Sequence, residues 1–264
     1  MKDIKLWENA PLLIEGEHVP YMTYYPSETE SEAAIVIYAG GGYSHRAKHE
    51  GEGYAEYFSK AGFHCFVTHY RTSPYVFPVE LLDARRAVRY VRANAERYGI
   101  NPEKIAVMGS SAGGHLAALV STYRAEIDGE GVDATDAVDP IPNAQVLCYP
   151  VLDPTGHLGS YIRLLGADKF AANWKSVTPM LLADENTPMC FMWHCEGDRV
   201  VDAANTLRYS TRLLELGVSQ ETHIYPRGRH GIGLVNEDRF IGEEYMQSWA
   251  PMAVKWFKLH NWIS

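Results

Sequence analysis

The pentapeptide 109–113, Gly-Ser-Ser-Ala-Gly, contains a serine in a setting that suits a nucleophile. It follows the apolar run 105–108 and leads into the helix-like stretch 114–120. A G-x-S-x-G sequence between a strand and a helix is typical of a nucleophile elbow, a sharp turn that pushes the serine hydroxyl into a cleft. The flanking glycines leave room for the strand and the helix to approach each other. We therefore predict that Ser111 is a nucleophile.

A carboxylate and a histidine follow two later predicted strands. Asp198 comes just after the apolar segment 189–193, and His230 comes just after 223–225. The carboxyl ends of parallel strands meet at one edge of a sheet, so both side chains are expected near the serine. An imidazole can take the serine proton, and a carboxylate can fix the imidazole tautomer and steady its positive charge. Asp202 is the alternative carboxylate, but Asp198 is closer to the strand end.

A glycine run, 39–43 (Ala-Gly-Gly-Gly-Tyr), follows the predicted strand 33–38. Glycines let backbone N–H groups approach a developing oxyanion without interference from Cβ atoms. Each motif alone has a simpler explanation, because glycine runs form tight turns and Asp and His are common in surface loops. The order of glycine loop, serine elbow, Asp and His, each after its own strand, favours catalysis.

The composition permits one large core and excludes several kinds of partner. The chain has 264 residues, 46% of them hydrophobic, and a net charge of −9. This acidic balance argues against binding to nucleic acid or to an anionic membrane. The sequence contains no uninterrupted apolar run of about 18 residues, the minimum for a membrane-spanning helix. The N-terminal sequence lacks the apolar core of a signal peptide, so we expect a cytoplasmic protein.

The sequence predicts neither a metal site nor a cofactor. The four cysteines have no C-x-x-C spacing and are interpreted as reduced core thiols. The nearest histidine pairs, His45 with His49 and His64 with His69, sit on a loop and across a strand end, without metal-ligand spacing. The phosphate-binding P-loop and the dinucleotide-binding G-x-G-x-x-G are absent from the sequence.

Short apolar runs alternate with helical patterns along most of the chain. Helical spacing marks 81–98, 203–216 and a last helix that begins near Pro251. This alternation predicts an α/β fold in one domain over 1–264, with a mostly parallel sheet of about eight strands and helices on both faces. The expected parallel strands are 33–38, 63–68, 104–108, 144–149, 189–193 and 221–225, with antiparallel edge strands at 12–14 and 19–25.

Several short motifs together carry a family resemblance. They are 39–44 (Ala-Gly-Gly-Gly-Tyr-Ser), 49–51 (His-Glu-Gly), 70–71 (Tyr-Arg), 109–117 (Gly-Ser-Ser-Ala-Gly-Gly-His-Leu-Ala), 150–153 (Pro-Val-Leu-Asp), 193–194 (Trp-His) and 226–231 (Pro-Arg-Gly-Arg-His-Gly). From about residue 19 onward the chain resembles small bacterial esterases, the acetyl-xylan and feruloyl esterase-like branch of the α/β-hydrolases, close to the hormone-sensitive-lipase-like group. The resemblance implies the α/β-hydrolase fold, with Ser111 as nucleophile, Asp198 as orienting carboxylate and His230 as general base.

The same resemblance implies an oxyanion hole formed by the backbone N–H groups of Gly41, Gly42 and Ala112. Ala39 stands where the hormone-sensitive-lipase pattern has a histidine that braces this loop, so the choice of donors stays open. The segment 153–188, with its bulky aromatic residues, lies where α/β-hydrolases insert a lid. The alternative is a crossover that merely covers the sheet.

We expect a serine carboxylesterase that hydrolyses short-acyl esters, with O-acetyl groups on sugars or xylo-oligosaccharides as substrates. The alternatives are an amide hydrolase with the same triad, kynurenine-formamidase-like or peptidase-like, and a non-catalytic binding protein of this fold. Tyr43 and Trp249 are candidates to line the acyl or sugar pocket, with the core as their alternative place. His115, on the helix after the elbow, is expected to be a packed, hydrogen-bonded histidine. The sequence leaves open whether the chain forms a homo-oligomer.

Overall fold

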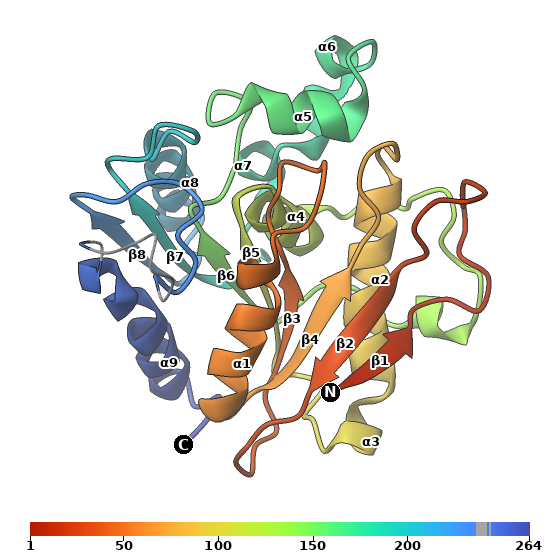
Figure 1. Cartoon of the computed structure of the whole chain (residues 1–264), viewed down its shortest axis with the longest axis horizontal. Coiled ribbons are helices and arrows are strands. Elements are labelled where there is room, and N and C mark those ends of the chain that lie inside the picture. The colour runs from red at the N-terminus through yellow and green to blue at the C-terminus, as the bar shows by residue number, and fades with distance from the viewer. Residues whose placement is uncertain (236–241, 243) are drawn as a thin grey trace.

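The computed structural model describes residues 1–235, 242 and 244–264 and has one eight-stranded sheet at its centre (Figure 1). The strands are β1 (Lys2–Lys5), β2 (Tyr21–Tyr25), β3 (Ala34–Tyr38), β4 (His64–His69), β5 (Ile105–Ser110), β6 (Ala144–Cys148), β7 (Met189–Cys195) and β8 (Gln220–Tyr225). Their order is β1-β2-β4-β3-β5-β6-β7-β8. β1 and β2 pair antiparallel with their neighbours, and the other pairs are parallel. The predicted mostly parallel α/β sheet is confirmed.

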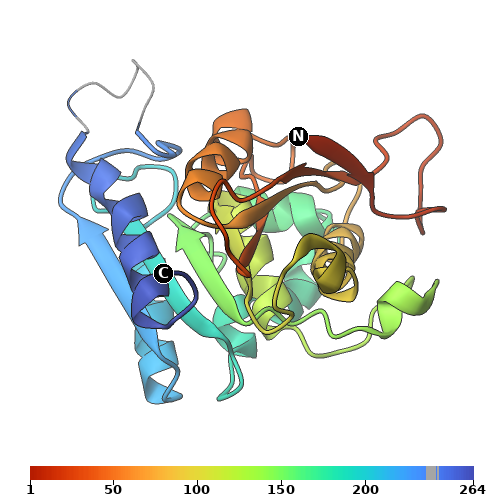
Figure 2. The same cartoon turned by 90° about the horizontal axis from the view of Figure 1, so that it is seen from below.

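Helices cover both faces of the sheet (Figures 1 and 2). On one face, α2 (Val79–Ala93), α4 (Ser111–Thr122) and α8 (Ala204–Glu215) share a hydrophobic cluster with the strands. On the other face, α1 (Glu52–Lys60) and α9 (Trp249–Leu259) contribute to a second cluster. The remaining helical segments are η1 (Lys48–Glu50), α3 (Ala95–Tyr98), η2 (Ala134–Ala137), α5 (Leu158–Leu165), α6 (Phe170–Asn173), η3 (Trp174–Val177), α7 (Pro179–Leu182) and η5 (Glu244–Ser248).

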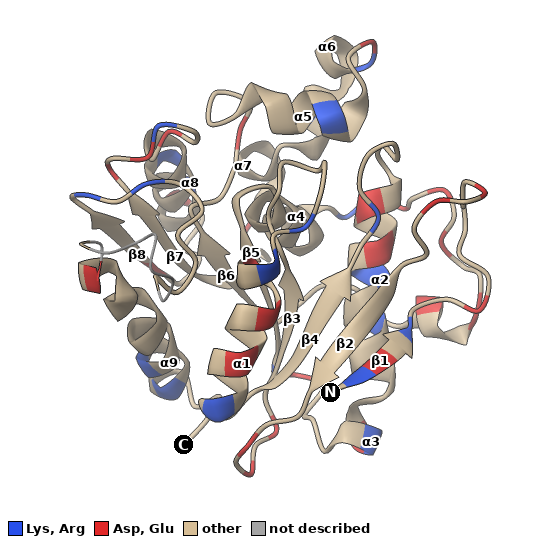
Figure 3. Cartoon of the chain, in the orientation of Figure 1, with Lys and Arg blue, Asp and Glu red and all other residues tan. Residues whose placement is uncertain are grey.

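The central strands have the composition of strands packed between two helical layers. Every residue of β3, β5 and β6 is buried. The strands β3 to β7 contain no Lys, Arg, Asp or Glu, and Figure 3 shows these charges on the surrounding helices and loops. A parallel sheet covered on both faces needs such apolar strands, because neither side of it meets water.

The helix predicted over 81–98 is two helices in the structure. α2 ends at Ala93, and the side-chain amide of Asn94 donates to the carbonyl oxygen of Tyr90 at 2.8 Å. Such a local side-chain bond competes with the regular helix ladder. α3 then makes one further turn and ends at Tyr98, and the next residue, Gly99, has a φ of 69°. The apolar stripe runs across this break, which is why periodicity alone predicts a single helix.

The predicted edge strand at 12–14 is wrong. Leu12 has a φ of 54°, which a strand does not adopt, and the N–H of Ile14 donates to the hydroxyl of Tyr75 at 3.1 Å. The outer strand is instead β1, in which Ile4 is the only buried side chain. An edge strand with one buried residue has no apolar run, so pattern analysis does not detect it.

Between β6 and β7, the segment 153–188 forms short helices beyond the carboxyl ends of the central strands (Figure 1). Tyr161 of α5 is buried, and its ring lies edge-on to that of His115 with centroids 4.9 Å apart. Phe170 and Trp174 are partly buried against the same cluster. The aromatic residues of this segment therefore anchor it to the core above α4.

The described residues contain neither a membrane-spanning helix nor a cluster of metal-ligand side chains. Among these residues, no helix combines the length and the hydropathy that crossing a membrane requires. Within the same part of the chain, no group of three or more His, Cys, Asp and Glu side chains could hold a metal ion. All four cysteines are buried thiols.

Candidate active site

Ser111 lies at the sharp turn between β5 and α4. Its φ is 54°, in the left-handed region that a residue with a side chain adopts only under strain. A Cβ atom at Gly109 would lie 2.1 Å from the carbonyl oxygen of Gly113, and one at Gly113 would lie 2.1 Å from that of Tyr38. Neither glycine can therefore be replaced by a larger residue without moving backbone. This is the close approach of strand and helix that the G-x-S-x-G pattern predicts.

Three side chains from separate loops form one hydrogen-bonded chain. The Ser111 hydroxyl donates to Nε2 of His230 at 2.7 Å, and Nδ1–H of His230 donates to Oδ2 of Asp198 at 2.7 Å. An ionised carboxylate only accepts hydrogen bonds, so it fixes the imidazole proton on Nδ1. The lone pair of Nε2 then faces the hydroxyl, as a general base requires. The structure thus brings together the three residues that the sequence singles out.

Asp198 is buried and receives four hydrogen bonds from the residues that the structure describes. Its Oδ1 accepts from the backbone N–H groups of Val200 at 2.8 Å and Val201 at 2.9 Å. Its Oδ2 accepts from Nε2 of His194, at 3.2 Å, as well as from His230. Burial raises the pKa of Asp198, but the hydrogen bonds from His194 and His230 outweigh it and hold the pKa well below its usual range. The carboxylate is therefore ionised at neutral pH.

Asp202 takes no part in this chain. Its Oδ1 accepts instead from the backbone N–H of Ala204, the first residue of α8, at 2.9 Å. His194 is a partner of Asp198 to which the sequence alone assigns no role. Its Nδ1 faces the hydroxyl of Thr206 at 2.8 Å, so both ring nitrogens are engaged and the ring is fixed beside Asp198. Its place in β7, four residues before Asp198, was the available signal.

The glycine loop after β3 lies against the elbow serine. A Cβ atom at Gly40 would be 3.1 Å from the Cβ of that serine. Oε2 of Glu50 accepts the N–H of Gly40 at 2.9 Å, which removes this amide from the candidate oxyanion donors. The next two residues, Gly41 and Gly42, have φ values of 133° and 61°, which favour glycine. Ala112 is in the first turn of α4, where backbone N–H groups have no acceptor within the helix.

Comparison with known proteins decides the family. The BD-FAE family matches residues 22–213. The crystal structure of an acetyl ester-xyloside bifunctional hydrolase from Caldicellulosiruptor lactoaceticus is 36% identical and has a TM-score of 0.92, covering 100% of this chain and 97% of that one. The chain belongs to the BD-FAE family. The expected esterase-type α/β-hydrolase is thereby confirmed.

Two further relatives of this BD-FAE protein are longer than it is. Endo-1,4-beta-xylanase B of Butyrivibrio fibrisolvens is 31% identical over 247 residues, which are 90% of this chain and 39% of the relative. Acetylxylan esterase of Xylanibacter ruminicola is 30% identical over 227 residues, 80% of this chain and 43% of the relative. The chain thus spans about two fifths of the length of each.

In this BD-FAE family member, the segment between β6 and β7 reaches the glycine loop. Nη1 of Arg163, on α5, donates to the carbonyl oxygen of Gly42 at 3.1 Å. His157 caps the same helix, its Nδ1 accepting the N–H of Ser160 at 3.2 Å. Burial, and after it the nearby positive charge of Arg163, lower the pKa of His157. Sequence reasoning missed both residues because Arg163 and Gly42 lie 121 positions apart.

The structure corrects the expectation for two aromatic residues of the BD-FAE chain. Tyr43 is 1% exposed and Trp249 is 0% exposed, so neither can line a pocket for an acyl or sugar group. The hydroxyl of Tyr43 donates to Nδ1 of His115 at 2.6 Å, and Trp249 stacks on Trp193 with centroids 5.1 Å apart. Both are core residues, which is the alternative that the sequence left open. His115 is packed and hydrogen-bonded as expected, and burial lowers its pKa to about 4.

Proposed function

We propose that the chain is a serine carboxylesterase that hydrolyses short-acyl esters, with O-acetyl groups on sugars or xylo-oligosaccharides as its substrates. The observation that carries this proposal is the chain of Ser111, His230 and Asp198, with 2.7 Å at each step. It stands at a strained elbow beside a glycine loop, the setting in which a serine acts as an acyl acceptor. The roles of nucleophile, base and orienting carboxylate follow from the direction of its hydrogen bonds.

In the acylation step, Oγ of Ser111 attacks the carbonyl carbon of the ester while its proton passes to Nε2 of His230. Asp198 stabilises the imidazolium that forms. The N–H groups of Gly41, Gly42 and Ala112 are the proposed donors to the oxyanion of the tetrahedral intermediate. The intermediate then collapses, the ester C–O bond breaks, and His230 gives its proton to the departing alcohol oxygen.

Deacylation repeats these steps with water in place of the serine. His230, neutral again, takes a proton from the water as its oxygen attacks the carbonyl carbon of the acyl-enzyme. The second tetrahedral intermediate releases the carboxylic acid, and the imidazolium returns a proton to Oγ of Ser111. Every proton moves through His230, so we expect chelating agents to leave the activity unchanged.

The substrate class rests on two supports. The relatives include an acetylxylan esterase and an acetyl ester-xyloside hydrolase by name, which favours an acetyl ester over an amide. Arg163 contacts the glycine loop, and His157 caps the same helix, α5. Such groups suit a leaving group rich in hydroxyls better than an aliphatic chain. We therefore interpret the segment 153–188 as the cover of the site.

We also propose that the protein lies in the cytoplasm and that its partner is a dissolved small-molecule ester. The four cysteines are buried thiols, which favours a reducing compartment, the cytoplasm. The net charge of −9 favours a dissolved substrate over nucleic acid or an anionic membrane. Cell fractionation with an antibody against the native chain tests the compartment, and a signal in the medium would contradict it.

The first test replaces the proposed nucleophile. Ser111→Ala should lower kcat for p-nitrophenyl acetate by roughly 10⁵- to 10⁶-fold with little change in Tm, because the nucleophile and its base act as a unit. Ser110→Ala is the matched control, since its hydroxyl pairs with that of Tyr54 at 2.8 Å instead of with His230. A Ser110→Ala variant that loses more activity than Ser111→Ala would contradict the assignment.

The second test measures acyl-chain length. We expect kcat/KM to be highest for acetyl or propionyl p-nitrophenyl esters and at least about tenfold lower for octanoyl, since a short pocket gives added methylenes no apolar surface to bind. Acetylated xylo-oligosaccharides should release acetate, whereas formyl-kynurenine and an aminoacyl amide should not be cleaved. A rate that climbs from acetyl to octanoyl would overturn the short-acyl proposal.

A further inference from the structure

We propose that Glu50 is a positioning residue that fixes the glycine loop and the histidine loop relative to each other. The proposal rests on the esterase function given above. Glu50 is the last residue of η1, is 2% exposed, and touches neither Ser111 nor the Asp198–His230 pair through a hydrogen bond of its own. Its two carboxylate oxygens serve two different loops of the site, and this division carries the proposal.

The first oxygen holds the glycine loop. Oε2 of Glu50 accepts the backbone N–H of Gly40 at 2.9 Å. Gly40 directly precedes Gly41, the first of the proposed oxyanion donors, and its Cα lies close enough to the elbow that an added Cβ would be 3.1 Å from that of Ser111. A shift of Gly40 therefore moves the neighbouring amides relative to the attacked carbonyl group.

The second oxygen holds the histidine loop through a tyrosine. Oε1 of Glu50 accepts the hydroxyl proton of Tyr149 at 2.7 Å, and the hydroxyl oxygen of Tyr149 accepts the N–H of Gly233 at 2.9 Å. The ring of Tyr149 also packs edge-on against that of His230, with centroids 5.1 Å apart. We call this set of four residues, Gly40, Glu50, Tyr149 and Gly233, the Glu50 bridge.

The residue before Glu50 supports the same arrangement. Nε2–H of His49 donates to the carbonyl oxygen of Gly231, directly after His230, at 2.8 Å. Its ring also fills the space beside Gly233, where an added Cβ would meet Cδ2 of His49 at 2.9 Å. Two adjacent side chains of η1 thus hold the segment that follows the proposed base, His49 directly and Glu50 through Tyr149.

The chemistry of the bridge explains why a carboxylate is used. Both groups that hydrogen-bond to Glu50, an N–H and an O–H, are donors, so the position requires two acceptors on one short side chain. Burying a carboxylate is costly, and hydrogen bonds from fixed donors offset much of that cost. Alanine would leave two buried donors without acceptors and would free both loops. Glutamine can still accept from Gly40, and the hydroxyl of Tyr149 can turn to accept from the glutamine amide.

The test measures kcat and KM for p-nitrophenyl acetate in the full chain. Glu50→Ala should lower kcat by about 10²-fold with KM changed by no more than about threefold, because small displacements of catalytic groups cost about this much. Glu50→Gln should recover most of the loss. Tyr149→Phe should lower kcat about tenfold, and the double variant with Glu50→Ala should be no slower than Glu50→Ala alone, since both break one bridge.

Two controls separate positioning from simple stability. Glu52→Ala removes a carboxylate two residues away that pairs with Lys48 at 3.3 Å, and Tyr38→Phe removes a buried hydroxyl that donates to the carbonyl oxygen of Ala84. Both should keep kcat within about twofold, because surface and remote hydrogen bonds do not set the loop geometry. If Glu50→Ala fails to fold, Glu50→Gln and Tyr149→Phe with their cycle carry the test.

The outcomes separate this inference from the proposed function. The positioning role is overturned if the wild-type enzyme is active and Glu50→Ala keeps its kcat. A variant that differs from the wild type only in KM, or only in the fraction of folded protein, overturns it as well. Additive losses in the double variant overturn the bridge as a single unit. A wild-type chain without esterase activity overturns the proposed function itself, and the positioning role with it.

Discussion

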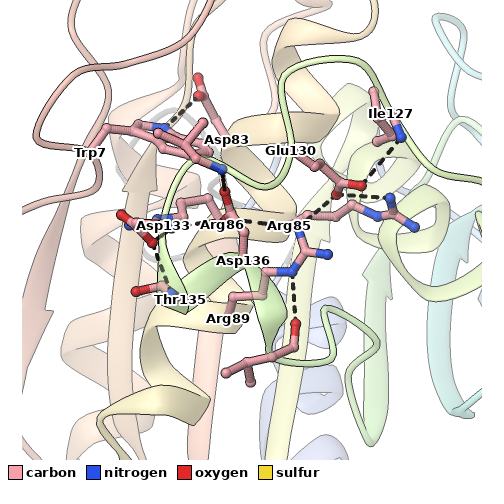
Figure 4. A network of polar contacts seen from close by, with 12 residues as sticks. Trp7, Asp83, Arg85, Arg86, Arg89, Ile127, Glu130, Asp133, Thr135 and Asp136 are labelled. Atoms are coloured by element: carbon pink, nitrogen blue, oxygen red, sulfur yellow. Dashed lines mark hydrogen bonds and ion pairs between the residues drawn. The ribbon is translucent and has the colours of Figure 1, made fainter.

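Two polar networks in this protein, each with at least one buried carboxylate, use charge in different ways. One is the Glu50 bridge. The other, which we call the α2 arginine cluster, joins three arginines of α2 to three acidic residues of the segment before β6 (Figure 4). Its members are Arg85, Arg86, Arg89, Glu130, Asp133 and Asp136.

The α2 arginine cluster balances its charges. Arg86 binds both carboxylate oxygens of Asp133 at 2.6 Å and contacts Asp136 at 2.9 Å. The same guanidinium donates to the carbonyl oxygen of Leu6 at 2.9 Å and lies 4.5 Å from the ring centroid of Trp7. Arg86 therefore ties the N-terminal segment and the η2 region to one helix. Paired ions of this kind position surface segments, and none of these groups belongs to the proposed triad.

The Glu50 bridge has one carboxylate and neutral donors instead. Two of its donors are backbone N–H groups, and both belong to loops of the proposed site. Burial of a charge therefore does not by itself indicate a role in the site. The role depends on the segments to which the partners of the charge belong. Loss of the α2 arginine cluster should lower the free energy of unfolding, whereas loss of the Glu50 bridge should lower kcat.

Loss of the orienting carboxylate tests the site side of this contrast. Asp198→Asn should lower kcat by about 10⁴-fold, because an amide in place of the carboxylate favours the wrong tautomer of His230. Asp202→Asn is the matched control and should have little effect, since the Asp202 carboxylate accepts from the N–H of Ala204 at the start of α8 instead of from His230. Steady-state kinetics of the two variants gives the ranking. The reverse ranking would transfer the orienting role to Asp202.

The α2 arginine cluster is tested by removing its central arginine, Arg86. Arg86→Ala should lower the free energy of unfolding by about 3 kcal/mol, because it leaves the buried carboxylate of Asp136 without its main partner. The kcat of the folded enzyme should stay within about twofold. Urea unfolding and kinetics at low temperature measure the two quantities separately. Arg97→Ala, at an exposed arginine over Tyr98, should change stability by about 0.5 kcal/mol or less. A large loss of kcat in Arg86→Ala would erase the contrast.

The sequence allowed prediction of those parts of the site that are local in the chain. The elbow at Ser111 and the positions of Asp198 and His230 after strands are short-range patterns, so the residues could be found before their distances were known. The parallel sheet followed from apolar runs in the same way. The oxyanion donors Gly41, Gly42 and Ala112 remain a proposal. Gly40 is not among them, because its N–H donates to Glu50.

The parts that could not be predicted depend on long-range packing. Glu50 and Tyr149 lie 99 positions apart, and nothing in the local sequence of either indicates the other. Tyr43 and Trp249 had a suitable residue type for a sugar pocket, but only the three-dimensional packing shows that both are buried. β1 was missed for a related reason, since one buried isoleucine among polar residues has no periodicity.

The pH dependence of stability tests the charge balance of the α2 arginine cluster. The hydrogen bond from Arg86 is the main cause that lowers the pKa of Asp133 from 3.8 to about 2. The folded state thus favours the ionised form, so its stabilising contribution is complete above about pH 4 and is lost as the pH falls toward 2. Because 42% of this side chain is exposed, solvent screening limits the contribution to about 1 kcal/mol or less.

Asp133→Asn isolates this charge, because the side-chain oxygen of asparagine can still accept the N–H of Thr135, which Asp133 accepts at 2.8 Å. We expect the variant to be less stable than the wild type at pH 6 and the difference to shrink at pH 3, as measured by urea unfolding at both values. Asp128→Asn, at an exposed position of the same segment, controls for the general loss of one negative charge. A difference that stays constant or grows on acidification would mean that the Arg86 pair is not its source. The contrast with the Glu50 bridge would then rest on Arg86 and Asp136 alone.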